Sequence, residues 1–194
     1  MNIVFTEPFR NQLLPFTYTK PISELRCGIL KMREKWEHFF SKSSFSHQTE
    51  EYLQETYWPV KLEADNLFIN ASVFPNNKLV KELVELKMDE ALFYEEVLIA
   101  YRSAYENRFS KKIQLQNEPM MLKNTWDIFA LNHKAIALDF NIITQGRESA
   151  PLPEHVLAIN QKQIFLEPGA KLINGTLNAT DGPIYIGKDA EVME

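Results

Sequence analysis

The chain has 194 residues, of which 45% are hydrophobic and 24% are charged, the usage of an ordinary folded protein with room for one domain and part of another. Its formal net charge of -5 excludes a general affinity for nucleic-acid backbone, which requires a clustered cationic face. No window reaches the roughly 18 apolar residues of a membrane span, no secretory signal opens the chain, and the single cysteine, Cys27, fits a reducing compartment. These features predict a cytoplasmic protein without nucleic-acid or membrane partners.

The first 50 residues predict a strand, a helix and a loop. The apolar run 2–5 is typical of a short buried strand that ends at residues 7–8. From 21 to 40, apolar residues recur every three or four positions behind Pro21, which predicts an amphipathic helix with Cys27 buried inside it. The polar run 41–51 predicts a surface loop.

Strands and helices continue to alternate up to about residue 150. The pattern predicts a buried strand over 66–75, a helix over 78–88 capped by Asn77, two strands around residues 95–96 with a helix as the alternative, and a helix over 126–144 capped by Asn124 or Thr125. Alternation of this kind predicts an α/β domain with a largely parallel sheet. We assign residues 1–160 to this domain.

The last part of the chain contains an internal repeat. Residues 164–172 and 184–192 share one pattern of apolar residues and alanine at an offset of 20, which is typical of stacked coils in a parallel β-solenoid. We expect Gly169 and Gly187 at turns, and inward positions at Leu166, Ala170, Leu172, Ile186, Ala190 and Val192. Chance likeness of two short pieces is the alternative. About three coils are needed for stability, so we expect residues 161–194 to be the first coils of a longer solenoid in the natural protein.

These pieces together resemble the sugar-1-phosphate nucleotidyltransferase family, in particular divergent bacterial relatives of the bifunctional N-acetylglucosamine-1-phosphate uridyltransferase/glucosamine-1-phosphate acetyltransferase. The resemblance is carried by residues 13–21, 126–129, 146–147 and 182–192. It implies a Rossmann-like nucleotide-diphospho-sugar transferase fold, followed by a left-handed parallel β-helix of hexapeptide repeats. In such enzymes the first domain joins a nucleoside triphosphate to a sugar phosphate with Mg²⁺, and the β-helix transfers an acyl group and forms trimers.

The family's phosphate loop reads Gly-x-Gly-Thr-Arg-Leu-x-Pro-Leu-Thr, then three residues and Pro-Lys. Aligned on residues 15–17, this frame places Leu13 on the family leucine and Pro21 on the later proline. The two glycines fall on Pro8 and Arg10, the arginine on residue 12 and the lysine on residue 22. Backbone N–H groups approach phosphate closely where no Cβ intervenes, so the resemblance does not extend to the groups that hold a triphosphate.

A second departure follows the strand over 66–70. The family ends this strand in Gly-Asp, whose carboxylate holds Mg²⁺, whereas this chain has Ala71 and Ser72. A neutral hydroxyl does not replace the charge of a carboxylate in a magnesium site. Mg²⁺ is therefore an expected cofactor only if nucleotidyl transfer is retained, and the four histidines show no metal-ligand spacing.

We predict substrate-binding roles for three cations and two strand-end polar residues and name no catalytic residue; the candidates are Arg10, Lys20, Asn70, Ser72 and Arg147. The alternatives are solvated surface charges for Arg10 and Lys20, a satisfied strand-end turn for Asn70 and Ser72, and a helix-ending glycine turn for the pair at 146–147. Two functions remain open. One is a nucleotidyltransferase of UDP-N-acetylglucosamine type, acting on a nucleoside triphosphate and a sugar phosphate; the other is a catalytically silent domain that binds a sugar nucleotide or serves as a scaffold. The resemblance implies a trimer for the full-length protein, while the present chain is expected as a monomer or, through exposed strand edges, a dimer.

Overall fold

The computed structural model describes residues 1–193, and the chain divides between Ala130 and Leu131 into two compact units. The division falls inside helix α4 (Thr125–Thr144), which confirms the helix predicted over 126–144. It reflects packing within each part, and the functional boundary expected near residue 160 stays a prediction. None of the helices in residues 1–193 combines the length and the apolar character needed to cross a membrane.

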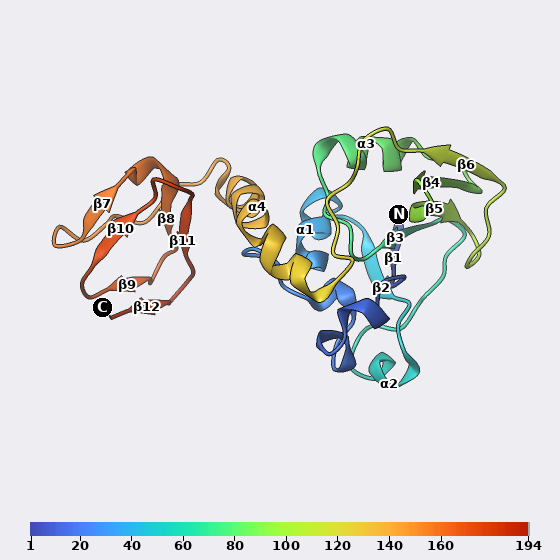
Figure 1. Cartoon of the computed structure of the whole chain (residues 1–194), viewed down its shortest axis with the longest axis horizontal. Helices are drawn as coiled ribbons and strands as arrows, with labels where there is room; N and C mark the ends of the chain where they lie inside the picture. The colour runs from blue at the N-terminus through green and yellow to red at the C-terminus, as the bar shows by residue number, and fades with distance from the viewer. Residues whose placement is uncertain (194) are drawn as a thin grey trace. The chain divides into compact units, whose positions relative to one another are not determined.

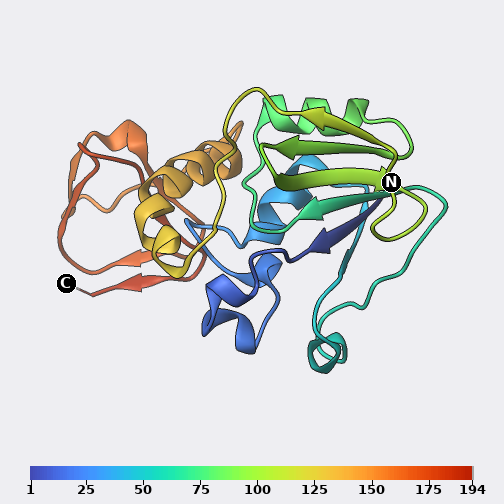
Figure 2. The same cartoon turned by 45° about the vertical axis from the view of Figure 1, so that its right-hand side comes forward.

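The first unit is built on a six-stranded sheet in the order β2-β1-β3-β5-β4-β6 (Figures 1 and 2). Its strands are β1 (Asn2–Thr6), β2 (Ser44–His47), β3 (Asn66–Asn70), β4 (Glu90–Tyr94), β5 (Val97–Ser103) and β6 (Lys111–Gln114). Only β5 runs against the other five strands. The predicted α/β class with a mainly parallel sheet is therefore confirmed, and it fits a Rossmann-like fold.

The helix predicted over 21–40 is wrong in its first half. A 3₁₀ turn, η3 (Ile22–Glu24), is followed by extended backbone at Leu25 and by Gly28 with φ 88°, so the chain bends where the apolar spacing predicted a continuous helix. Helix α1 (Met32–Phe39) begins only where the Glu34 carboxylate accepts the Lys31 N–H at 2.7 Å. Cys27 is buried as predicted, but outside a helix.

The loop predicted over 41–51 was also wrong, because it contains β2 and the short helix α2 (Glu51–Gln54). β2 reads Ser-Phe-Ser-His and pairs in parallel with β1 at the edge of the sheet. Its strand state comes from this long-range pairing, which polar residues do not announce locally.

The other predictions for the first unit are confirmed with one shift. Helix α3 (Asn77–Glu85) is capped by Asn76 instead of Asn77, since the Asn76 side chain accepts the Leu79 N–H at 3.0 Å. β4 and β5 form the predicted hairpin, and Glu95 in its turn has φ 51°. Two further 3₁₀ turns, η1 (Asn11–Leu13) and η2 (Phe16–Tyr18), shape the loop after β1.

The second unit contains three pairs of short parallel strands. They are β7 (Leu157–Ile159) with β10 (Thr176–Asn178), β8 (Ile164–Leu166) with β11 (Ile184–Ile186), and β9 (Lys171–Leu172) with β12 (Glu191–Val192), with η4 (Gln161–Gln163) between β7 and β8. Ile164 faces Ile184 and Leu172 faces Val192, which is the offset of 20 read from the repeat. A left-handed β-helix stays a prediction.

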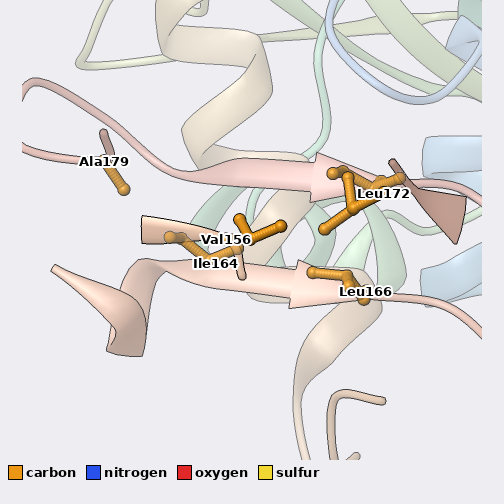
Figure 3. Close-up of a cluster of buried hydrophobic side chains, with 6 residues drawn as sticks. Val156, Ile164, Leu166, Leu172 and Ala179 are labelled. Carbon is orange, nitrogen blue, oxygen red and sulfur yellow. The ribbon is translucent and has the colours of Figure 1, made fainter. Parts of the chain in front are cut away.

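A small apolar core lies inside these strand pairs. Figure 3 shows its side chains converging from successive segments; the buried members are Val156, Ile164, Leu166, Leu172, Ala179 and Ile186. The other predicted inward residues, Ala170, Ala190 and Val192, pack against this core while partly buried. Gly169 occupies a turn with φ 82°, whereas in the equivalent turn of the next coil the left-handed residue is Asp189, with φ 56°.

Candidate functional site

The candidate site lies where β1, β2 and β3 end. These three strands are parallel neighbours, so the loops that follow Thr6, His47 and Asn70 meet at one edge of the sheet. Ligands of open α/β sheets bind at this carboxyl edge. A hollow of about 270 Å³ opens between the loops after β1 and β2 and is lined by Glu7, Arg10, Gln48, Thr49, Glu50 and Glu51.

Arg10 is the central side chain of this hollow, and its donors are directed into the protein. One terminal nitrogen donates to Glu7 at 3.0 Å and to the Thr49 hydroxyl at 3.2 Å; the other donates to the Thr17 carbonyl and, at 3.0 Å, to the Tyr52 hydroxyl. Arg10 is 9% exposed. The guanidinium therefore braces the loop after β1, and little of it faces a ligand.

Glu7 makes the matching acidic half of this brace. One carboxylate oxygen accepts the Ile22 backbone N–H, and the other accepts Arg10 and, at 2.6 Å, the Thr49 hydroxyl. Thr17 closes the ring by donating its hydroxyl to the Arg10 carbonyl at 2.8 Å. The glycine-poor loop is thus held by side chains in a shape of its own, and not by the backbone turns of a phosphate loop.

Asn70 and Ser72 form the end of β3. The Asn70 amide donates to the Leu98 carbonyl at 3.1 Å, and its oxygen accepts the Ser72 N–H at 3.1 Å and the Ser72 hydroxyl at 2.5 Å. Both residues are at most 1% exposed. The structure therefore brings these two predicted residues together in a buried, satisfied turn.

The donor set at this edge does not fit a magnesium site. Mg²⁺ is bound through carboxylates and water, whereas the end of β3 offers a neutral amide and hydroxyl bonded to each other, and the Glu7 carboxylate is occupied by Arg10 and Thr49. Within residues 1–193, no three histidine, cysteine, aspartate or glutamate side chains gather closely enough to hold a metal ion.

The two remaining candidates lie apart from this arrangement in the sequence. Lys20, half-buried, forms no ion pair or side-chain hydrogen bond with any of residues 1–193. Arg147 belongs to the second unit, where it donates to Glu167 at 2.6 Å and stacks over Phe165 at 5.1 Å from the ring centroid. This pairing raises the pKa of Arg147 and, together with the hydrogen bond from Tyr185, lowers that of Glu167.

A buried polar cluster supports the start of this edge from β2. His47 is 1% exposed, its Nδ1 lies 2.7 Å from the Ser23 hydroxyl, and burial lowers its pKa to about 4, with the Glu24 charge opposing and the Arg33 charge adding to the effect. Burial raises the pKa of Glu24, but hydrogen bonds from Arg33 and Lys31 outweigh this and hold it below the usual range. The imidazole is therefore neutral at physiological pH.

Sequence reasoning missed Glu7, Gln48 and Thr49 as members of the hollow. Glu7 had a usable signal, since it directly follows the first strand and precedes Arg10 by three residues. Gln48 and Thr49 had none, because they follow β2, the strand that sequence patterns failed to predict.

Comparison with known proteins gives one positive result. A family model described as "Sugar nucleotidyl transferase" matches residues 2–148, which includes the whole six-stranded sheet, the hollow and α4. No curated protein matches the chain.

Proposed function

The chain belongs to the sugar nucleotidyl transferase family, and from this premise we propose that its first unit binds a nucleoside diphosphate sugar where β1, β2 and β3 end. The observation that carries the proposal is the hollow at this edge, formed by the loops that follow two neighbouring parallel strands. UDP-N-acetylglucosamine is the sugar nucleotide we propose, because the loop frame at Leu13, residues 15–17 and Pro21 resembles the enzymes that make it.

The chemistry of the hollow suits the sugar better than a triphosphate. Its acidic side chains are Glu7, Glu50 and Glu51, against the single cation Arg10. Carboxylates accept hydrogen bonds from sugar hydroxyls and repel phosphate. We therefore propose that the sugar lies in the hollow, held by Glu50 and Glu51, whose carboxylates are less committed to internal contacts than that of Glu7.

Binding without turnover is the form of this function that the geometry favours. Each preorganised charge that stabilises a transition state is commonly worth about 3 kcal/mol. The position of the family's magnesium carboxylate holds the buried Ser72, and the loop cation Arg10 is engaged within the protein. A domain of this kind supplies a bound sugar nucleotide to other parts of an enzyme or acts as a scaffold.

Nucleotidyl transfer is the second candidate. It is favoured by the length of the family match, which spans the whole first unit, and by Lys20, a cation in the loop after β1 whose ammonium group has no ion pair within residues 1–193. In this reaction a sugar-phosphate oxygen attacks the α-phosphorus of a nucleoside triphosphate and pyrophosphate leaves. The second unit is then proposed as the start of an acyltransferase-type β-helix that forms trimers.

Thermal unfolding with UDP-N-acetylglucosamine, in Mg²⁺ and in EDTA, tests the proposal. We expect the same stabilisation in both, and no release of pyrophosphate from UTP with N-acetylglucosamine 1-phosphate. Glu50→Ala should weaken the stabilisation, whereas Glu55→Ala, which removes an exposed carboxylate outside the hollow, should leave it intact. Pyrophosphate release would establish the second candidate, and no response to any nucleotide or sugar would refute both.

A further inference from the structure

A second hollow lies at the opposite ends of β1 and β2. It has a volume of about 490 Å³ and is lined by Asn2, Ser44, Phe45, Ser46, Trp58, Pro59, Val60, Lys61 and Glu63. Asn2 and Ser44 begin their strands, whereas the candidate sugar site lies where these strands end. The two hollows share no lining residue.

The walls of this hollow are mostly apolar and partly aromatic. β2 is an edge strand, and beyond it the segment around Trp58 and Pro59 crosses the sheet edge, held by the hydrogen bond from His47 N–H to the Trp58 carbonyl at 3.0 Å. Trp58 is 55% exposed although its ring stacks against His47 at 5.9 Å. Phe45 is half-buried on the neighbouring strand position. An indole and a phenyl ring that reach both solvent and a hollow offer apolar contact to a planar ligand.

One buried hydroxyl in this lining has no partner. Ser46 is 3% exposed, and its Oγ is the buried side-chain oxygen or nitrogen that forms no hydrogen bond within residues 1–193. The neighbouring polar groups are satisfied: the Ser44 hydroxyl donates to the Asn2 amide oxygen at 2.8 Å, and the Asn2 nitrogen donates to the Lys61 carbonyl and to Asn66. An unsatisfied buried hydroxyl is unfavourable, so a ligand group that reaches Ser46 gains more than one that reaches Ser44.

We propose that this hollow is a second small-molecule site, which takes a planar, largely apolar ring carrying one hydrogen-bonding group directed to the Ser46 hydroxyl. Its volume lies within the range of about 300–1,000 Å³ that small-molecule sites occupy, and a few polar groups in an apolar lining are what such sites use to orient a ligand. The charged side chains in its lining, Lys61 and Glu63, are exposed, so the buried polar contact falls to Ser46. The site is independent of the sugar-nucleotide proposal.

Phenol and toluene, which differ by one hydroxyl group, are suitable probes for the full chain. We expect phenol to shift the Trp58 indole N–H signal saturably in ¹H–¹⁵N spectra, with the signal assigned through Trp58→Phe. Ser46→Ala should weaken phenol binding about fivefold, the effect of one hydrogen bond, and leave toluene binding unchanged.

Ser44→Ala is the matched control, since it removes a satisfied hydroxyl from the same lining, and it should leave phenol affinity within twofold of the parent chain. Ser46→Ala retains the shape of a small buried side chain, so loss of folding is not expected to obscure the comparison. The proposal is overturned by the absence of a saturable Trp58 shift with phenol, or by equal weakening in the two serine variants.

Discussion

Arg10 shows how a single residue can occupy a functional position and still serve the fold. Its guanidinium joins Glu7, Thr49, Tyr52 and the Thr17 carbonyl, and leaving such buried partners unsatisfied is costly. We expect Arg10→Gln to lower the free energy of unfolding by about 2–4 kcal/mol, measured by urea denaturation. Lys20→Gln in the same loop, which breaks no ion pair within residues 1–193, should change it by less than about 0.5 kcal/mol.

His47 gives the molecule a dependence on acid. Its folded pKa of about 4 lies below the ordinary value of 6.5, so the unfolded chain binds more protons between these values. The stabilising contribution is complete above pH 6.5 and is lost as the pH falls toward 4, by up to about 3 kcal/mol.

Urea unfolding between pH 4 and pH 7 checks this expectation, and the slope is the quantity to compare. His47→Gln should flatten the rise of stability in this window even if it destabilises the core at every pH. A variant slope equal to that of the parent chain would assign the acid dependence to other groups. The depressed pKa of Glu24 acts in the same direction but below its ordinary value of 4.5, which separates the two contributions.

The sequence predicted residue roles best where one residue type permits one conformation. Asn70 and Ser72 were placed at a strand end from the strand pattern alone, and the structure has them there. The direction of a side chain was beyond reach: whether Arg10 faces a ligand or its own loop depends on Thr49 and Tyr52, which are about 40 residues away in the chain.

At the scale of elements, the turn at Gly169 carries a specific constraint. Its φ is 82°, and a Cβ at this position would lie 2.1 Å from the Asp189 carboxylate oxygen in the next coil. Gly169→Ala combines backbone strain of about 1 kcal/mol or more with this contact. We expect it to destabilise the second unit by about 1–3 kcal/mol.

Hydrogen exchange at β8, β9, β11 and β12 would measure this effect. Gly182→Ala is the control, because a Cβ there meets nothing within 4 Å and its φ is not in the left-handed region, and it should leave exchange at these strands unchanged. Equal protection in the two variants would show that the turn tolerates a side chain.

Elements were predictable when their apolar period was long and uninterrupted. α4 and the β4–β5 hairpin followed from sequence. Residues 21–31 did not become helix although their apolar spacing is helical, because Gly28 and the extended Leu25 turn those side chains inward from a bent chain. β2 was missed because its pairing partner, β1, lies about 40 residues earlier.

At the scale of the whole molecule, each unit has a separate apolar core. The second unit is organised around side chains such as Leu166, which is 1% exposed, and truncation of a buried leucine commonly costs about 2–5 kcal/mol. We expect Leu166→Ala to lower protection from hydrogen exchange throughout β7–β12 and to leave β1 and β3 protected. A uniform loss in both units would mean that they unfold as one cooperative body.

The strand pairs of the second unit do not repeat with one period. Ile164 faces Ile184, a spacing of 20, but Leu157 faces Thr176, a spacing of 19. The additional residue is taken up between β10 and β11, in the corner that contains Gly182, where space is open. Corners of this architecture therefore accept changes in length while the ladders stay in register, so evolution can lengthen this corner into a recognition loop without disturbing the core beneath it.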